Sequence, residues 1–124
     1  MTTEAKGHAH RITIQREASH VKVTHKGTVL AETMNPVVLR EGRLPVRYYL
    51  TPEDIRMELF EPSDKHSTCP FKGEASYWTA RVSEDTLEDV LWSYPDPIPE
   101  AVGVAGLLCF YSERTDVEVD GKKI

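Results

Sequence analysis

The sequence predicts an all-β fold with one or two short helical turns. Short segments such as 12–14 and 21–24 alternate apolar and polar residues with the period of two that a half-buried strand requires. Other segments, above all 74–82, are rich in aromatic and β-branched residues. About eight to ten such segments follow one another closely between turn residues, and this spacing is typical of two packed sheets or a small barrel.

The first half of the chain predicts a hairpin followed by two strands. Residues 20–33 form the hairpin, with its turn at Lys26 and Gly27, because glycine takes positive φ without steric cost. Asn35 and Pro36 end this unit, and strands follow at 37–39 and 46–50.

A short helical turn is expected next. Thr51 can cap a helix, Pro52 suits the first helical position, and Glu53 and Asp54 complement the helix dipole. Residues 63–73 are polar and predict a loop.

The second half predicts four more strands. Residues 74–82 form a strand, 83–89 an acidic turn with at most one helical turn, and 90–94 another strand. Three prolines make 95–99 a stiff loop. The last strands are expected at 107–112 and 116–119, before a turn at Asp120 and Gly121.

Length and composition predict one domain. At 124 residues, two domains would each be too small for a sound core. Residues 1–10 are polar and predict a disordered tail, so the domain is expected to cover 11–124.

Charge and hydropathy argue against several classes of partner. Fifteen Lys and Arg against twenty Asp and Glu give a net charge of −5, which argues against binding nucleic acid. No apolar stretch is long enough to span a membrane, and the first residues do not form a secretory signal. With only Cys69 and Cys109 and no CxxC motif, we expect a cytoplasmic protein without a disulfide framework.

Most familiar catalytic and cofactor motifs are absent. There is no P-loop, no GxGxxG and no GxSxG. His66 and Cys69 have a spacing that could suit zinc, but no second ligand pair is present, so we expect neither a metal nor a cofactor.

Cys69 is the one candidate for a catalytic nucleophile. Lys65, His66 and Lys72 are close in sequence, and positive neighbours lower the pKa of a thiol. The competing interpretation, which we favour, is that Pro70 and its neighbours fix a turn in which Cys69 simply packs.

The aromatic residues give the clearest indication of a binding site. Tyrosines and tryptophans from several strands, with a few charged residues nearby, are the usual lining of a small-molecule pocket, although they could equally fill a core. The predicted ligand-binding residues are Glu32, Glu41, Arg47, Tyr48, Tyr49, Lys72, Tyr77, Trp92 and Tyr94. Adjacent strand residues point to opposite faces, so only one of Tyr48 and Tyr49 would face the ligand.

Several of these residues belong to a series of short motifs. The order of these motifs along the chain resembles that of the family called Domain of Unknown Function 427. The order comprises Ala31-Glu32-Thr33, Glu41, Tyr48-Tyr49, Pro52, Asp54-Ile55, Thr68-Cys69-Pro70, Lys72-Gly73, Ala75, Tyr77, Trp92, Tyr94, Pro97, Gly106, Phe110-Tyr111, Val117, Val119 and Asp120-Gly121. The resemblance covers residues 20–121, and its one departure is Glu32-Thr33, where the family often has Asp-Ser.

The resemblance implies a β-tent-like fold, in which two antiparallel sheets lean together at a steep angle. Zinc-bearing relatives of that fold carry paired CxxC motifs, which this chain lacks, so a zinc-free tent is implied. A nucleotidyltransferase-like label is sometimes attached to the family, but the sequence has no matching carboxylate set.

Three hypotheses of function follow. The first is a domain that binds a small polar or anionic ligand in an aromatic cleft between the sheets, where Lys72 meets the ligand and Glu32 and Glu41 orient cations. The second is an enzyme that uses Cys69, or Lys72 with a tyrosine. The third is a homodimeric interaction module that uses free sheet edges.

Overall fold

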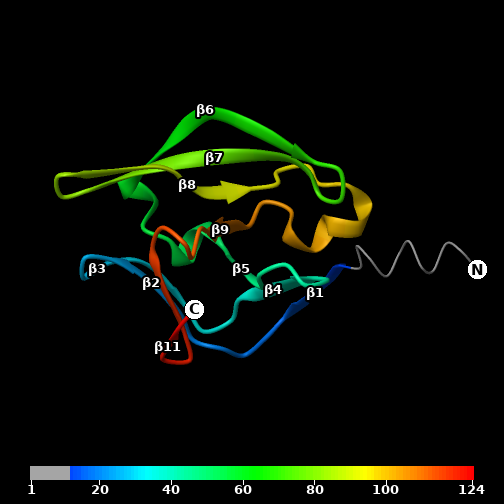
Figure 1. Ribbon diagram of the computed structural model, residues 1–124, viewed down its shortest axis with the longest axis horizontal. Coiled ribbons are helices and arrows are strands. Elements are labelled where there is room, and N and C mark those ends of the chain that lie inside the picture. Colours follow the sequence, from blue (N-terminus) through cyan, green and yellow to red (C-terminus); the bar gives the residue numbers. More distant parts are fainter. Residues whose placement is uncertain (1–11) are drawn as a thin grey trace, which may run out of the picture.

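The computed structural model describes residues 12–124, which form two antiparallel sheets connected by turns and three short 3-10 helices (Figure 1). The predicted mainly β fold is therefore confirmed. The predicted disordered tail at 1–10 lies outside the described residues.

The larger sheet has seven strands in the order β1-β4-β5-β9-β8-β7-β6. Their bounds are β1 Ile12–Arg16, β4 Val37–Glu41, β5 Arg47–Leu50, β6 Phe60–Cys69, β7 Gly73–Val82, β8 Asp85–Ser93 and β9 Leu108–Phe110.

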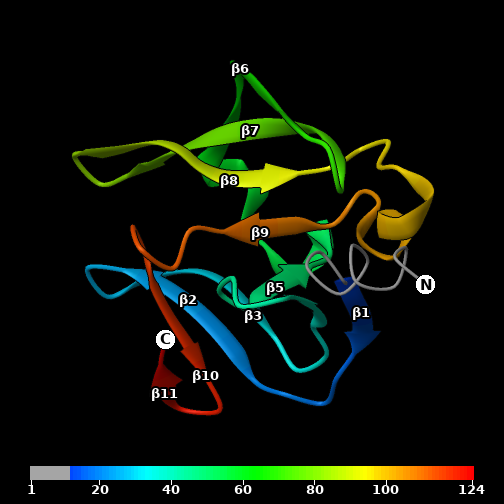
Figure 2. The ribbon, with the colours of Figure 1, turned by 45° about the vertical axis from the view of Figure 1, so that its right-hand side comes forward.

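The smaller sheet has four strands in the order β11-β10-β2-β3. Their bounds are β2 Val21–His25, β3 Thr28–Thr33, β10 Asp116–Val119 and β11 Lys122–Lys123. The predicted hairpin is confirmed as β2 and β3, and both Lys26 and Gly27 take positive φ in its turn. Figure 2 shows this sheet at the lower left, below β6, β7, β8 and β9 of the larger sheet.

The helical content is limited to 3-10 turns in the described residues: η1 Pro52–Asp54, η2 Met57–Leu59 and η3 Pro99–Val104. The predicted helix start is the short turn η1, with Pro52 at its beginning, but the Thr51 side chain makes no capping hydrogen bond. The turn η3 was not anticipated from the sequence.

Two predicted connections are strands instead. The polar loop expected at 63–73 is wrong, because β6 runs through it to Cys69 and pairs with β7. The acidic turn expected at 83–89 is also wrong, since β8 already begins at Asp85. β6 is an edge strand with mostly exposed side chains, so it needs no apolar alternation to pair with its neighbour.

Both faces of the larger sheet carry apolar side chains. One face packs on the smaller sheet, where Leu50, Leu91 and Phe110 meet Val21 and Val23 in a buried core.

The opposite face carries a second buried cluster, which includes Tyr49, Trp92 and Cys109 and is covered in part by Val104 of η3 and Ile14 of β1. Neighbours in sequence thus fall into different clusters, as Leu91 and Trp92 do, because strand residues alternate between faces. The candidate site lies on this second face.

Candidate functional site

The face of the larger sheet that turns away from the smaller sheet holds a pocket of about 200 Å³. Its lining comes from β4, β5, β7 and β8 and from the segments that follow β4, β6, β8 and β9. The polar and aromatic residues that line it are Glu41, Arg47, Tyr49, Lys72, Tyr77, Trp92, Tyr94 and Tyr111.

Strand register brings the aromatic side chains together. Tyr77 lies opposite Trp92, Trp92 opposite Cys109, and Cys109 opposite Tyr49, so one row of side chains crosses four strands. Residues that are directly opposite on adjacent strands have side chains close enough to interact. The row places Trp92 in the middle of the site.

Trp92 is held by tyrosines on two sides. Its indole Nε1–H donates to the hydroxyl of Tyr49 at 3.3 Å, and the two rings meet edge-on at 6.3 Å between centroids. The Tyr111 ring lies 4.4 Å from the Trp92 ring at an interplanar angle of 47°. These contacts form a fixed aromatic wall.

Three of the phenols that line the pocket, those of Tyr49, Tyr94 and Tyr111, have a raised pKa and stay protonated at physiological pH. Burial raises the pKa of Tyr49 and of Tyr94 above the ordinary value. Burial, together with a hydrogen bond to Tyr77, raises the pKa of Tyr111 to about 12. The Tyr77 hydroxyl lies 2.7 Å from Oγ of Ser67. The pocket therefore offers neutral hydroxyl groups that can donate or accept hydrogen bonds.

Lys72 enters the pocket from the turn between β6 and β7. The turn is closed by a hydrogen bond from the Lys72 N–H to the carbonyl of Cys69 at 3.1 Å, and the Ile98 N–H donates to the Lys72 carbonyl at 2.9 Å. Gly73 has a φ of +121°, and a Cβ there would lie 3.1 Å from Cα of Pro97. The proline-rich segment thus packs directly on the turn and fixes Lys72.

The charge of Lys72 is neutralised within the pocket. Its Nζ lies 2.5 Å from Oε1 of Glu41, and both side chains are largely buried.

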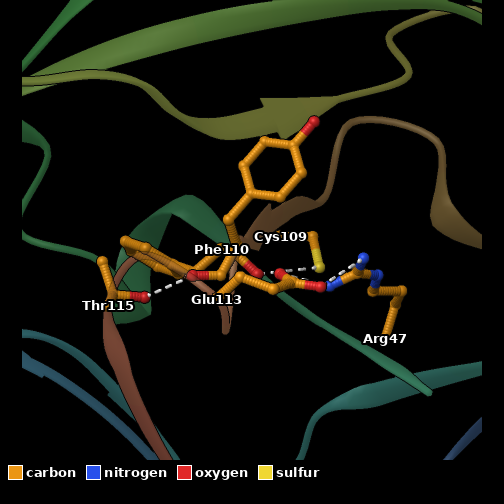
Figure 3. A network of polar contacts seen from close by, with 6 residues as sticks. Arg47, Cys109, Phe110, Glu113 and Thr115 are labelled. Carbon is orange, nitrogen blue, oxygen red and sulfur yellow. Dashed lines mark hydrogen bonds and ion pairs between the residues drawn. The ribbon is translucent and has the colours of Figure 1, made fainter. Parts of the chain in front are cut away.

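Arg47 is the second cation of the pocket. It shares a face of β5 with Tyr49, two residues later. Its guanidinium lies 5.2 Å from the centre of the Trp92 ring and 5.8 Å from that of Tyr111. Figure 3 shows the same guanidinium pointing toward the carboxylate of Glu113. The two nitrogen–oxygen distances of this contact are 3.3 and 3.4 Å. Hydrogen bonding from Arg47 lowers the pKa of Glu113.

Two of the nine predicted ligand-binding residues lie elsewhere. Tyr48 points to the opposite face of β5, and Glu32 lies on β3 of the smaller sheet, where it pairs with His20 at 2.5 Å. The other seven all line the pocket.

The predicted position between the two sheets is not where the pocket lies. The space between the sheets near Tyr48 is only about 10 Å³, because Val21, Leu50 and Phe110 fill it. Four lining residues were not among the predicted ligand-binding residues: Leu39, Leu44, Pro45 and Tyr111. Tyr111 could have been found from its place in the aromatic run that follows Cys109.

Neither cysteine lines the pocket. Cys69 ends β6 and is partly buried against the second cluster. Cys109 is fully buried, and this burial raises the pKa of its thiol to about 12. Within residues 12–124 no group of three metal-ligating side chains comes together. In the same range, no helix is long and apolar enough to cross a membrane.

Comparison with known proteins gives a family. A search of curated proteins found no match. The profile of a family described as "Domain of unknown function (DUF427)" matches residues 13–121, a range that contains every residue lining the pocket. This match spans most of the chain and agrees with the resemblance found in the sequence, so the chain belongs to the DUF427 family.

Proposed function

We propose that the protein binds a small polar or anionic ligand in the aromatic pocket of the larger sheet. The observation that carries the proposal is the convergence of Arg47, Lys72 and five aromatic side chains from separate strands and turns on one cavity of about 200 Å³. Pockets with aromatic walls and a few placed polar groups are typical of ligand sites. The volume lies below the roughly 300–1,000 Å³ of most drug-sized sites, so the ligand is small.

Native mass spectrometry of freshly purified protein tests this proposal. We expect a reproducible extra mass on the wild-type protein. A smaller fraction of the Tyr77→Phe variant should carry this mass, because the variant removes a pocket hydroxyl and keeps the ring. Tyr48→Phe is the matched control, since Tyr48 lies on the opposite face of the sheet. A bare protein in the spectrum, together with unchanged Trp92 indole resonances in a screen of small polar compounds, would contradict the proposal.

The enzymatic alternative has less support from the geometry. A catalytic Lys72 would have to leave the carboxylate of Glu41, and the pKa values of Tyr94 and Tyr111 are raised, which disfavours their ionised forms. Cys69 lies outside the pocket lining. Turnover at Cys69 would therefore need a substrate site other than this pocket.

We also propose three finer points from the sequence analysis. Membership of the DUF427 family and two antiparallel sheets that share one core support a β-tent arrangement. The unpaired thiols of Cys69 and Cys109 support a cytoplasmic location, where thiols stay reduced. The long edge strand β6 supports a homodimer, and light scattering at high concentration tests this: a monomer would contradict it.

A further inference from the structure

We propose that the ligand is a small monocarboxylate, and that its carboxylate takes the place of Glu113 on the guanidinium of Arg47. The inference rests on the proposed function and names the chemical class of the ligand. It follows from a difference between the two cations of the pocket: Lys72 is paired with a buried carboxylate, whereas Arg47 is paired with an exposed one.

Lys72 is not available to an incoming anion. Its Nζ is 2.5 Å from Oε1 of Glu41, and the two side chains are only 13% and 5% exposed. Removing a partner from such a buried pair leaves an uncompensated charge, so a ligand gains nothing by separating them. Lys72 and Glu41 together present a neutral wall.

Arg47 is held differently. Its side chain is 19% exposed and lies over the rings of Trp92 and Tyr111, which fix the guanidinium without neutralising it. Its only described carboxylate partner is Glu113, on the loop after β9, whose side chain is 55% exposed. The guanidinium is therefore built into the site, whereas its carboxylate partner is on the surface.

The hydrogen bonds between Arg47 and Glu113 are long. Both nitrogen–oxygen distances, 3.3 and 3.4 Å, exceed the 2.7–2.9 Å of a charge-assisted hydrogen bond. Two nitrogens nevertheless face two oxygens, which is the fork geometry that binds a carboxylate in bidentate fashion. Glu113 thus shows that the guanidinium binds a carboxylate at this position. Because both hydrogen bonds are long, a ligand can displace the Glu113 carboxylate.

The rest of the pocket defines the body of the ligand. The walls include the side chains of Trp92 and of several tyrosines, beside the ion pair of Lys72 and Glu41. They suit a small, flat or apolar body that carries at most a hydroxyl or carbonyl group. A second negative charge would meet Glu41 without a free cation to balance it.

The test is a titration of the intact protein with benzoate and with its neutral analogue benzamide. Binding is followed by the indole N–H resonances in a ¹H–¹⁵N spectrum, where Trp92 reports the pocket. Trp78 is the internal reference, because it packs with the core between the sheets. The variants are Glu113→Gln and Arg47→Gln, with Glu58→Gln as a matched control from an exposed ion pair elsewhere.

We expect benzoate to shift the Trp92 resonance and to bind several-fold more tightly than benzamide. Glu113→Gln should raise the affinity for benzoate several-fold, since it removes the internal competitor, and Glu58→Gln should leave it unchanged. Arg47→Gln should abolish the preference for benzoate over benzamide.

Two results would overturn the inference in different ways. Equal binding of benzoate and benzamide, or an unchanged benzoate affinity in Glu113→Gln, would contradict the carboxylate site. The pocket itself would still bind a ligand, so the proposed function would stand. If neither probe moves the Trp92 resonance in wild type or in the Glu113→Gln variant, the carboxylate site fails, and the proposed function fails with it only if the native mass spectrum is bare and the screen of small polar compounds is also negative. Glu113 is exposed, so this variant is expected to fold.

Discussion

Lys72, in the turn before β7, and Glu41, at the end of β4, form an ion pair across the larger sheet. Nζ of Lys72 lies 2.5 Å from Oε1 of Glu41, although three strands, β5, β9 and β8, separate β4 from β7 in the sheet order. At the usual spacing of about 4.8 Å, four strand intervals would place β4 and β7 roughly 19 Å apart in a flat sheet. The turn before β7 and the two long side chains bridge this separation across the face of the sheet where the pocket lies.

Removing one partner of this pair is expected to destabilise the protein strongly. Glu41→Gln or Lys72→Met should each lower the free energy of unfolding by about 3–5 kcal/mol, because a mostly buried charge loses its partner. The double variant Lys72→Met/Glu41→Gln should lose much less than the sum of the two single losses. Urea unfolding measures all three.

The control for this cycle is the exposed pair of Arg81 and Glu61. Both side chains are more than half exposed, so Glu61→Gln should change stability by less than about 1 kcal/mol. Simple additivity of the Lys72 and Glu41 substitutions would show that the two groups do not interact in solution.

A second ion pair is expected to make stability depend on pH. Asp85 at the start of β8 accepts hydrogen bonds from His25 at 2.8 Å and from Lys26 at 3.0 Å, and these contacts lower its pKa below the ordinary 3.8. A carboxyl group whose pKa is lowered by folding stabilises the folded state above its unfolded pKa. That contribution is lost as the pH falls from about 4 through the folded-state pKa.

Asp85→Asn isolates this effect. The difference in unfolding free energy between wild type and the variant should be constant near neutral pH and shrink as the pH falls below about 4. Chemical unfolding at a series of pH values measures it. A difference that stays the same down to pH 2.5 would contradict the role of Asp85.

Local sequence signals predicted most of the strands and failed where pairing outweighed them. The hairpin turn at Lys26 and Gly27 was predictable because the turn chemistry is local. β6 was not predictable, because its exposed face and its bulge remove the apolar period of two, and its pairing with β7 alone makes it a strand. η3 carries glycine and small residues without a helical period.

The sequence predicted most of the residues of the site, but it did not predict on which face of which sheet they meet. Seven predicted residues do converge, yet Glu32 matched the same expectation and lies in the other sheet. Which carboxylate meets Lys72 depends on the order of the strands in the two sheets, and no local pattern encodes that order. The choice between Tyr48 and Tyr49 depends on strand register, since a shift of one residue exchanges the two faces.

Alkylation should distinguish the two cysteines. Burial raises the pKa of Cys109 to about 12, so its thiolate is negligible at pH 8, whereas Cys69 is partly exposed at the end of β6. We expect iodoacetamide to modify Cys69 and to leave Cys109 intact in the native protein, as measured by peptide mass spectrometry. In urea both should react alike. Modification of Cys109 in the native protein would show that the second buried cluster, which contains Cys109, opens to solvent.

A final prediction concerns Gly73, the residue that sets the position of Lys72. An alanine there would adopt a φ of +121° and place its Cβ 3.1 Å from the backbone of Pro97. We expect Gly73→Ala to lower the free energy of unfolding by about 1–3 kcal/mol or more. Gly27→Ala is the control, because Gly27 has a φ of +85° with open space around it and should cost only about 1 kcal/mol.

The mechanism of this effect can be separated from simple backbone strain. If Gly73 acts by holding Lys72 against Glu41, Gly73→Ala should cost less in a Lys72→Met background than in wild type, since the ion pair is already lost. The matching cycle with Gly27→Ala should be additive. Additivity in both cycles would mean that Gly73 stabilises only the turn, and that Lys72 reaches Glu41 without it.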